Sequence, residues 1–581
     1  MYLRTTKRRN ADGTEVRYFQ LAENVWDARR GCAVAKVVYN FGRADQVDGE
    51  MLRRLAKSIL RVVDGSVAAA AETVADGDLR VRDTWPYGGV HVLAGLWTEL
   101  GLDQVIRTHA RGKVTGRAFE RAIFAMVANR ALHPYSKLYC WEQWVREEVY
   151  LPSAQDLSLH HLYFAMDFLE DHKEAIEKEI FFKMADLMNA DVDVIFYDTT
   201  SLHFEVDEED AATLLHHGRE YEPLRKRGHS KNGRGDAPQI VVGLAVTRDG
   251  LPVRSWVFTG ERNDITTVAK VKEDLRGWRL GRCVFVGDAG MNSEENRRSL
   301  ALGNGKYILA SRMRAGDEVT KDVLSRAGRY HEVKDNLRVK EVIVGDGERR
   351  QRYVVCHNPD EAKRQRAHRE KVVAELETEL ASLEQRKGKS HSKRACELRV
   401  SGRFGKYLRE TSTDKLMLDR TAIADAARYD GKWVITSNDD TLTAEDLALG
   451  YKQLLRVEQC WRQLKSGLRM RPVFHYRSWR IQAHVTISVI ALLLERIAEI
   501  RVGDTWRNVR AELERVKVVE YDRGDARVQQ TTELSPVNVA LLRKLRVAAP
   551  AKLLAVGTIP AEDAEKKRRR PPPGPKKRPA A

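Results

Sequence analysis

Hydrophobic and polar positions change their spacing along the chain, and the first change separates a small β unit from a helical region. Over residues 1–65 they alternate on both sides of a turn-forming cluster at 10–13, which predicts a hairpin, then a third strand and a helix. From 83 to 190 apolar residues recur every three or four positions, which predicts a series of helices.

Between 191 and 312 strand-like runs replace the helical spacing. The runs VDVIFYD and RCVFVGD are almost continuously apolar and end in Asp198 and Asp288. Such runs are typical of strands buried on both faces. A turn signal at 248–250 joins two further strands, and helical stretches follow two of the runs. The pattern predicts an α/β fold, a mixed sheet with helices on its faces.

The remaining chain divides into three further parts. Residues 313–440 predict an α+β insertion, with short strands and a charged helix. The helix carries an apolar stripe, which indicates packing against a neighbour, at Val372, Val373, Leu376, Leu380 and Leu383. Helices return over 441–518, and 519–581 form an extension that ends in a basic, proline-rich tail expected to be disordered.

Charge adds a candidate partner. The 581 residues carry a formal net charge of +17, with 43% hydrophobic residues to build a core. An excess of cations favours a polyanionic partner such as nucleic acid, since neutralised phosphates release counterions. A generally basic surface without a specific ligand is the alternative. Basic residues and tryptophans are interleaved over 83–190, which fits a duplex-binding surface or a plain helical bundle.

Targeting and redox features are those of a soluble cytoplasmic protein. The six cysteines are scattered without a CxxC pair, which fits a reducing compartment. The N-terminus has no apolar run behind its positive charges, and the apolar stretch Ala483–Leu494 is too short to span a bilayer. The histidine pairs at 160–161 and 216–217 lack the ligand spacing of a zinc site, which argues against a zinc-dependent nuclease.

The two strand-terminal aspartates are candidates for metal binding. A carboxylate beside a buried strand is costly unless it is paired or binds a metal. Asp198 and Asp288 on neighbouring strands would offer the oxygen ligands that Mg²⁺ prefers. The alternative for each is a helix N-cap, which the residues after Asp288 fit nearly as well.

A third acidic residue lies in the segment YKQLLRVEQCWRQLKSG. Tyr451, Glu458 and Lys465 are seven residues apart, so on one regular helix they would share a sector of about 40°, with Arg462 one turn beyond Glu458. A second face would dock on the core through Val457, Cys460, Trp461, Leu464 and Leu468. Glu458 would complete the metal site and the cations would hold phosphates. An ordinary amphipathic surface helix is the alternative.

Together these motifs resemble the DDE insertion-sequence transposases, in the branch with a Tyr-(2)-Arg-(3)-Glu-(6)-Lys signature. The resemblance covers about 190–500 and includes FYDTTSLHFE and VFVGDAGMNS around the two aspartates. Leu454 stands at the signature arginine position, and Arg456 is predicted on another helix face. No arginine contact can therefore be carried over from the family, and Arg462 is our candidate substitute.

The resemblance implies an RNase H-like core whose catalytic residues Asp198, Asp288 and Glu458 hold two Mg²⁺ ions, with Mn²⁺ as a substitute. It also implies double-stranded DNA as partner, with cleavage at inverted-repeat ends, transfer of 3′-hydroxyl ends into target DNA, and a homodimer in the synaptic complex, in a bacterial cytoplasm near the nucleoid. Alternatives are an RNase H-like nuclease or resolvase, and a DNA-binding descendant that has lost catalysis.

Further DNA contacts are predicted from clusters of cations. A glycine-punctuated basic loop between the first two core strands would contact DNA or be only a solvated loop; its candidates are Arg225, Lys226, Arg227 and Lys231. Arg471 and Arg477 follow the signature and are expected to face phosphate, as are Tyr451, Arg462 and Lys465 within it.

Overall fold

The structure is a computed structural model that describes most of the chain. It describes residues 2–559 apart from 10–14, 28–30, 45–46, 48–78, 112–115, 189–191, 232, 279, 281–282, 314–318, 413–414 and 525. The predicted N-terminal helix and the basic tail lie outside the described residues. The chain divides into two compact units, the smaller formed by 1–84, 519–531 and 552–581 and the larger by 85–518 and 532–551.

The smaller unit is built from antiparallel strands. One sheet has the order β1-β2-β3 and the other the order β20-β19-β18-β4. The predicted N-terminal hairpin is confirmed, because β1 pairs antiparallel with β2. The strands are β1 (Tyr2–Arg9), β2 (Glu15–Asp27), β3 (Cys32–Arg43), β4 (Leu79–Pro86), β18 (Lys517–Arg523), β19 (Ala526–Thr531) and β20 (Leu553–Thr558).

The larger unit begins with the predicted helices. Helix α5 is buried almost all round and packs against α7 and α16, which fits its apolar residues on every side. Helix α7 begins at a capping box formed by Ser158 and His161. The elements are α3 (Gly88–Glu99), α4 (Leu102–His109), α5 (Gly116–Leu132), α6 (Lys137–Tyr139), η1 (Cys140–Glu148), η2 (Pro152–Ala154), α7 (Leu159–Asp171) and α8 (Lys173–Leu187).

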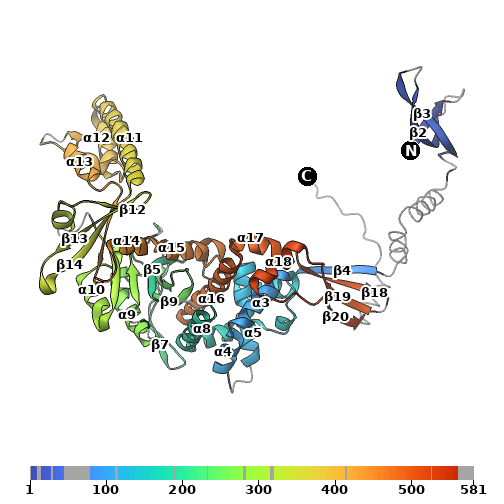
Figure 1. Cartoon of the computed structure of the whole chain (residues 1–581), viewed down its shortest axis with the longest axis horizontal. Helices are drawn as coiled ribbons and strands as arrows, with labels where there is room; N and C mark the ends of the chain where they lie inside the picture. The colour runs from blue at the N-terminus through green and yellow to red at the C-terminus, as the bar shows by residue number, and fades with distance from the viewer. Residues whose placement is uncertain are drawn as a thin grey trace. The chain divides into compact units, whose positions relative to one another are not determined.

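A large mixed sheet follows, in the order β12-β13-β14-β17-β11-β10-β5-β8-β9. Figure 1 labels its strands β5, β9, β12, β13 and β14. Strands β5, β10 and β11 run parallel, while β8, β9 and β17 are antiparallel to their neighbours. The strands are β5 (Val194–His203), β8 (Gln239–Val246), β9 (Pro252–Thr259), β10 (Val284–Gly287), β11 (Lys306–Ser311), β12 (His331–Lys334), β13 (Leu337–Val344), β14 (Gln351–His357) and β17 (Lys432–Ser437). The α/β sheet with flanking helices is confirmed.

The segment 313–440, which we predicted to be an α+β insertion inside the core, contributes strands to the core sheet. Its strands extend the core sheet, because β17 pairs with β11 on one side and with β14 on the other. Its helical part has an apolar core of its own, which includes the predicted stripe residues Val372, Leu376 and Leu383. The elements of this part are α11 (Pro359–Glu384), α12 (Gly388–Val400), η7 (Gly405–Tyr407), β15 (Leu408–Glu410), β16 (Leu416–Leu418) and α13 (Arg420–Ala427).

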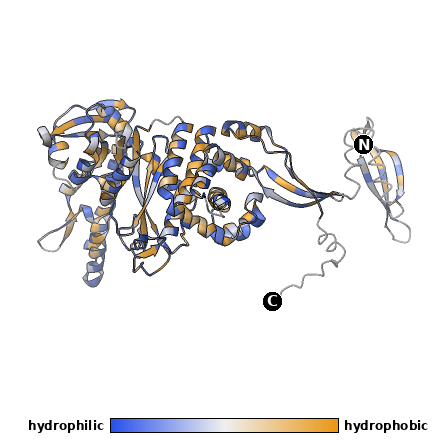
Figure 2. Ribbon diagram, turned by 90° about the horizontal axis from the view of Figure 1, so that it is seen from below, coloured by the Kyte–Doolittle hydropathy of each residue, from blue (hydrophilic) through white to orange (hydrophobic). Residues whose placement is uncertain are grey.

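Helices complete the larger unit. Most of α16 is buried, including the apolar stretch Ala483–Leu494. Blue and orange residues are interspersed along the helices in Figure 2, and no described helix is long and apolar enough to cross a bilayer. The helices are α9 (Asp264–Gly277), η3 (Ala289–Met291), α10 (Glu294–Ala301), α14 (Ala444–Lys452), α15 (Leu455–Arg462), η8 (Gln463–Gly467), α16 (Ser478–Val502), α17 (Trp506–Leu513) and α18 (Pro536–Leu545).

Candidate active site

Two of the predicted carboxylates are level with each other on neighbouring strands. The parallel register of β5 and β10 pairs Phe196 with Val286. Asp198 comes two residues after Phe196, and Asp288 comes two residues after Val286, both in extended backbone. Each aspartate therefore lies on the same face of the sheet as the earlier residue of its own strand. Neighbouring strands lie about 4.8 Å apart. The register therefore brings the two aspartates side by side at the carboxyl end of β10.

Asp198 lies in a poorly solvated position. Its side chain is 18% exposed. Burial raises the pKa of Asp198 to about 6; the Lys231 ammonium opposes this rise, and the nearby carboxylates of Asp288 and Asp264 add to it. Asp198 is therefore within electrostatic range of two further acidic side chains.

Lys231 belongs to an exposed loop, but its ammonium lies among these carboxylates. Its ammonium is 2.8 Å from an oxygen of Asp264 and 3.8 Å from Oδ1 of Asp198. It also donates to the carbonyl oxygen of Thr199 at 2.9 Å and to the hydroxyl of that threonine at 2.7 Å. The ammonium thus occupies a position where acidic and neutral oxygens converge, the kind of donor set that binds a cation.

Asp288 caps a helical turn, as the alternative interpretation predicted, but this does not remove it from the carboxylate cluster. Its Oδ1 accepts the backbone N–H of Gly290 at 2.8 Å at the start of η3. A Cβ added at Gly290 would lie 3.1 Å from Oδ1 of Asp288 and 3.4 Å from Oδ2 of Asp264. Glycine at this position therefore leaves room for both carboxylates.

Glu458 is exposed on α15, and its charge acts on Tyr451 together with the charges of the two aspartates. Burial raises the pKa of Tyr451, and the negative charges of Asp288, Glu458 and Asp198 raise it further. One tyrosine hydroxyl is thus within electrostatic range of all three predicted carboxylates. The predicted docking face is confirmed, with buried side chains at Val457, Cys460, Trp461, Leu464 and Leu468.

The prediction of one regular helix through the signature segment is wrong. Helix α14 ends at Lys452, a turn follows, α15 covers Leu455–Arg462, and a π-helical turn covers Gln463–Gly467. A constant 100° per residue therefore does not hold between Tyr451 and Lys465. The physical reason is tertiary: each piece turns its own apolar residues into the core.

The signature cations occupy distinct environments. Lys465 is partly buried, which lowers its pKa; Arg471 and Lys231 lower it further, while Asp198 raises it. Its ammonium is therefore near the carboxylate site. Arg462 is exposed at the end of α15. Leu454 is 7% exposed and belongs to the core, so this position offers no cation toward solvent.

Three residues of the basic loop are engaged in ion pairs within the chain. Arg225 donates through Nε and Nη2 to Oδ1 of Asp210, at 2.8 and 2.6 Å. Lys226 and Arg227 lie 3.6 and 3.7 Å from the carboxylate of Glu209. These partners reduce the positive charge available to a phosphate.

The cations after the signature also have partners. Arg471 Nη1 lies 3.3 Å from Nδ1 of His203, at the end of β5. Arg477 lies over the ring of Trp479, 5.4 Å from its centroid. The nearby Arg480 donates two hydrogen bonds to Asp167, at 2.7 and 2.8 Å.

Sequence reasoning missed Asp264 and Thr199. Asp264 is the first residue of α9, and the Thr199 hydroxyl donates to its carboxylate. An aspartate in the first turn of a helix is favoured by the helix dipole alone, so the sequence contains no separate signal for this position. The oxygen-rich donor set of Asp198, Asp264, Asp288 and Glu458 fits a divalent cation such as Mg²⁺.

Comparison with known proteins identifies the family. Residues 195–494, more than half of the chain, match the family described as Transposase DDE domain. Residues 3–71 match the domain described as IS1634 family transposase, N-terminal domain. No curated protein matches the chain.

Among solved structures, a cryo-EM structure of the piggyBac transposase synaptic complex with hairpin DNA matches weakly. It is 9% identical, covers 73% of this chain and 77% of its own, and has a TM-score of 0.32, so it adds no argument about function. The two family matches span the N-terminal β unit and the sheet that carries the carboxylates. The chain therefore belongs to the DDE insertion-sequence transposases, enzymes that cleave and join DNA, and it has the N-terminal domain of the IS1634 family.

Proposed function

We propose that this transposase cleaves the inverted-repeat ends of its element and joins the 3′-hydroxyl ends to target DNA at Asp198, Asp288 and Glu458. The observation that supports the proposal is the β5–β10 register, which sets Asp198 and Asp288 level with each other. The negative charges of Asp198, Asp288 and Glu458 all raise the pKa of Tyr451, which further supports it. The order and directions of β9, β8, β5, β10 and β11 support an RNase H-like core.

The carboxylates would hold two Mg²⁺ ions, with Asp198 shared between them and Mn²⁺ able to replace them. Bound ions of this kind activate an attacking oxygen and stabilise the departing one in an in-line displacement at phosphorus. Asp264 enlarges the oxygen donor set, and its hydrogen bond from Thr199 fixes its carboxylate beside Lys231. Exposed Glu458 is open to incoming DNA.

The chain's own cations would then orient the substrate. Lys465 is within electrostatic range of Asp198, and Arg462 is exposed on the helix that carries Glu458. Both would bind phosphates of the DNA near the scissile bond. Arg471, Arg477 and Tyr451 would extend this surface. Arg225, Lys226 and Arg227 would contact DNA only if their acidic partners were released.

The division of labour along the chain is also a proposal. Residues 1–65 and 83–190 would recognise the ends, 191–312 and 441–518 would form the catalytic core, and 313–440 would extend it. Recognition of two ends in one synaptic complex implies a homodimer on DNA.

Cleavage of DNA by matched variants tests the site. Duplexes carrying the inverted repeat next to the gene are incubated with Mg²⁺ and full-length Asp198→Asn, Asp288→Asn or Glu458→Gln. We expect loss of cleavage and strand transfer with retained DNA binding. Asp193→Asn and Glu294→Gln, which change exposed surface carboxylates, should remain active. Full activity in any of the three site variants would remove that residue from the site.

A further inference from the structure

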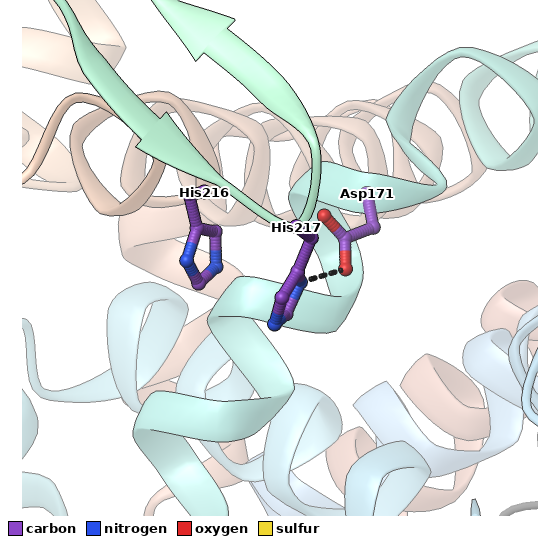
Figure 3. A group of neighbouring side chains, drawn as sticks. All are labelled: Asp171, His216 and His217. Atoms are coloured by element: carbon purple, nitrogen blue, oxygen red, sulfur yellow. Dashed lines mark hydrogen bonds and ion pairs between the residues drawn. The ribbon is translucent and has the colours of Figure 1, made fainter.

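A second group of possible metal ligands lies away from the catalytic carboxylates, where a hairpin meets the end of α7. The hairpin consists of β6 (Leu214–His216) and β7 (Arg219–Tyr221). Asp171 is the last residue of α7, and His216 and His217 lie at the tip of the hairpin (Figure 3). One potential ligand atom from each of these residues lies within 4.8 Å of the other two.

The hairpin turn holds its two histidines in fixed directions. His217 has a positive φ of 49° and is followed by Gly218 at 76°, a left-handed pair that makes the turn tight. His216 stacks on the indole of Trp479, with centroids 4.1 Å apart and planes 3° from parallel. Figure 3 shows both imidazoles directed away from the hairpin ribbon, with the carboxylate of Asp171 beside His217.

The polar atoms of this group are only partly satisfied by protein partners. His217 Nδ1 lies 2.8 Å from Oδ2 of Asp171. Nε2 of His216 is buried and has no hydrogen-bond partner among the described residues. The same holds for Oε2 of the adjacent Glu170, a residue that is only 7% exposed. A buried nitrogen without a partner is costly, and an ion bound to Nε2 of His216 would remove that cost.

We propose that Asp171, His216 and His217 bind one divalent transition-metal ion of the zinc class. Two imidazole nitrogens and one carboxylate oxygen are ligands that suit Zn²⁺ or Co²⁺, whereas Mg²⁺ prefers oxygens alone. Ligands about 2.1 Å from a tetrahedral zinc ion are about 3.4 Å apart. Because the three atoms lie within 4.8 Å of one another, side-chain adjustments of up to roughly 1.4 Å would bring them to that separation.

An ion can reach this group from solvent, and its binding would link two separate elements of the fold. A cavity of about 1070 Å³ is lined by Glu170, Asp171 and Arg219, so solvent reaches the edge of the group. The ion would tie the hairpin, which belongs to the segment between β5 and β8, to helix α7. The third ligand comes from a distant part of the sequence, which is why the spacing of the histidines alone did not indicate a metal site.

Metal binding by the full-length chain tests the proposal without any reference to DNA cleavage. The protein is loaded with Zn²⁺ or Co²⁺ in excess Mg²⁺, which saturates the carboxylate site, and the bound ion is measured by elemental analysis and by the visible absorption of Co²⁺. We expect one tightly bound ion. Loss of only an outer partner of a ligand costs about 10- to 100-fold in affinity, so His216→Gln and Asp171→Asn should each weaken binding by more than about tenfold.

Control variants separate this site from others. His160→Gln changes an exposed histidine of α7, and Asp198→Asn changes the carboxylate site; both should keep the ion. Asp171→Asn can still hydrogen-bond to His217, so circular dichroism should show a folded chain that has lost only the Zn²⁺-dependent rise in melting temperature. The proposal would be overturned if the unaltered chain held no ion, or if His216→Gln and Asp171→Asn bound the ion as tightly as the unaltered chain does.

Discussion

Replacing Lys231 by methionine should strengthen binding of divalent ions at the carboxylate site. The ammonium lies 2.8 Å from Asp264 and 3.8 Å from Asp198, so it already neutralises part of the charge that an ion would meet. Methionine fills much of the same volume without the charge. An incoming ion then no longer has to displace or approach a neighbouring cation.

The magnitude follows from distance and exposure. Two unit charges 4 Å apart interact by about 4 kcal/mol near a protein surface and by about 1 kcal/mol in water. The Lys231 side chain is 31% exposed and that of Asp198 is 18% exposed, so a value of about 1–3 kcal/mol lies between these limits. Because about 1.4 kcal/mol corresponds to tenfold, Lys231→Met should bind the ion about 10- to 100-fold more tightly.

Titration of the full-length chain with Mn²⁺, followed by electron paramagnetic resonance and competed with Mg²⁺, measures this affinity. Lys231→Arg keeps the charge and should change affinity little. Lys270→Met removes an exposed lysine that pairs with Asp274, away from the carboxylate site, and is the matched control. Unchanged or weaker Mn²⁺ binding by Lys231→Met would refute the argument that the ammonium competes with the ion.

Three further changes probe separate parts of the larger unit. Burial raises the pKa of Glu495 well above its ordinary value of 4.5, so the folded state keeps a proton that the unfolded state loses, and stability falls as pH rises above 4.5. Glu495→Gln should remove this loss, so its urea midpoint should exceed that of the unaltered chain by more at pH 8 than at pH 5. Arg369→Met leaves Asp430 without its two hydrogen bonds, at 2.5 and 2.6 Å, and should destabilise the helical part of 313–440 by about 2–4 kcal/mol; hydrogen exchange should rise there and not in β5. Gly290→Ala crowds the carboxylates of Asp288 and Asp264 and should slow DNA-end cleavage by about tenfold in a single-turnover assay. An unchanged rate would show that these side chains can move aside without loss of activity.

The spacing of apolar residues along the sequence was enough to predict the two aspartates of the site that lie at the ends of regular strands. The apolar runs before Asp198 and Asp288 predicted buried strands, and parallel pairing brings their ends together whatever the loops between them do. The spacing of apolar residues did not predict the path of the signature helix, because tertiary contacts determine where that helix is interrupted. The turn after Lys452 and the π-helical turn at Gln463–Gly467 break the helix on which the predicted face depended.

The abundance of basic residues predicted DNA-contacting side chains less well than the positions of strand residues predicted the carboxylate site. Because Lys231 lies in a basic loop, it was predicted either to contact DNA or to be part of a solvated loop, and folding places its ammonium beside Asp198 and Asp264. Arg225 in the same loop pairs with Asp210. The sequence shows that cations are abundant, whereas only the fold shows which of them already have anionic partners.

The three proposed catalytic carboxylates are not held equally firmly, and this should shape their separate contributions. Asp198 lies within β5, and Asp288 is fixed by its bond from Gly290. Glu458 is exposed on a short helix bounded by a turn and a π-helical segment, so its position depends on how α15 docks. Binding of an ion by the two aspartates therefore requires little movement of these carboxylates themselves, whereas recruitment of Glu458 restricts an exposed side chain and costs entropy. On this argument Asp198→Asn should abolish Mn²⁺ binding, while Glu458→Gln should weaken binding less than it slows cleavage.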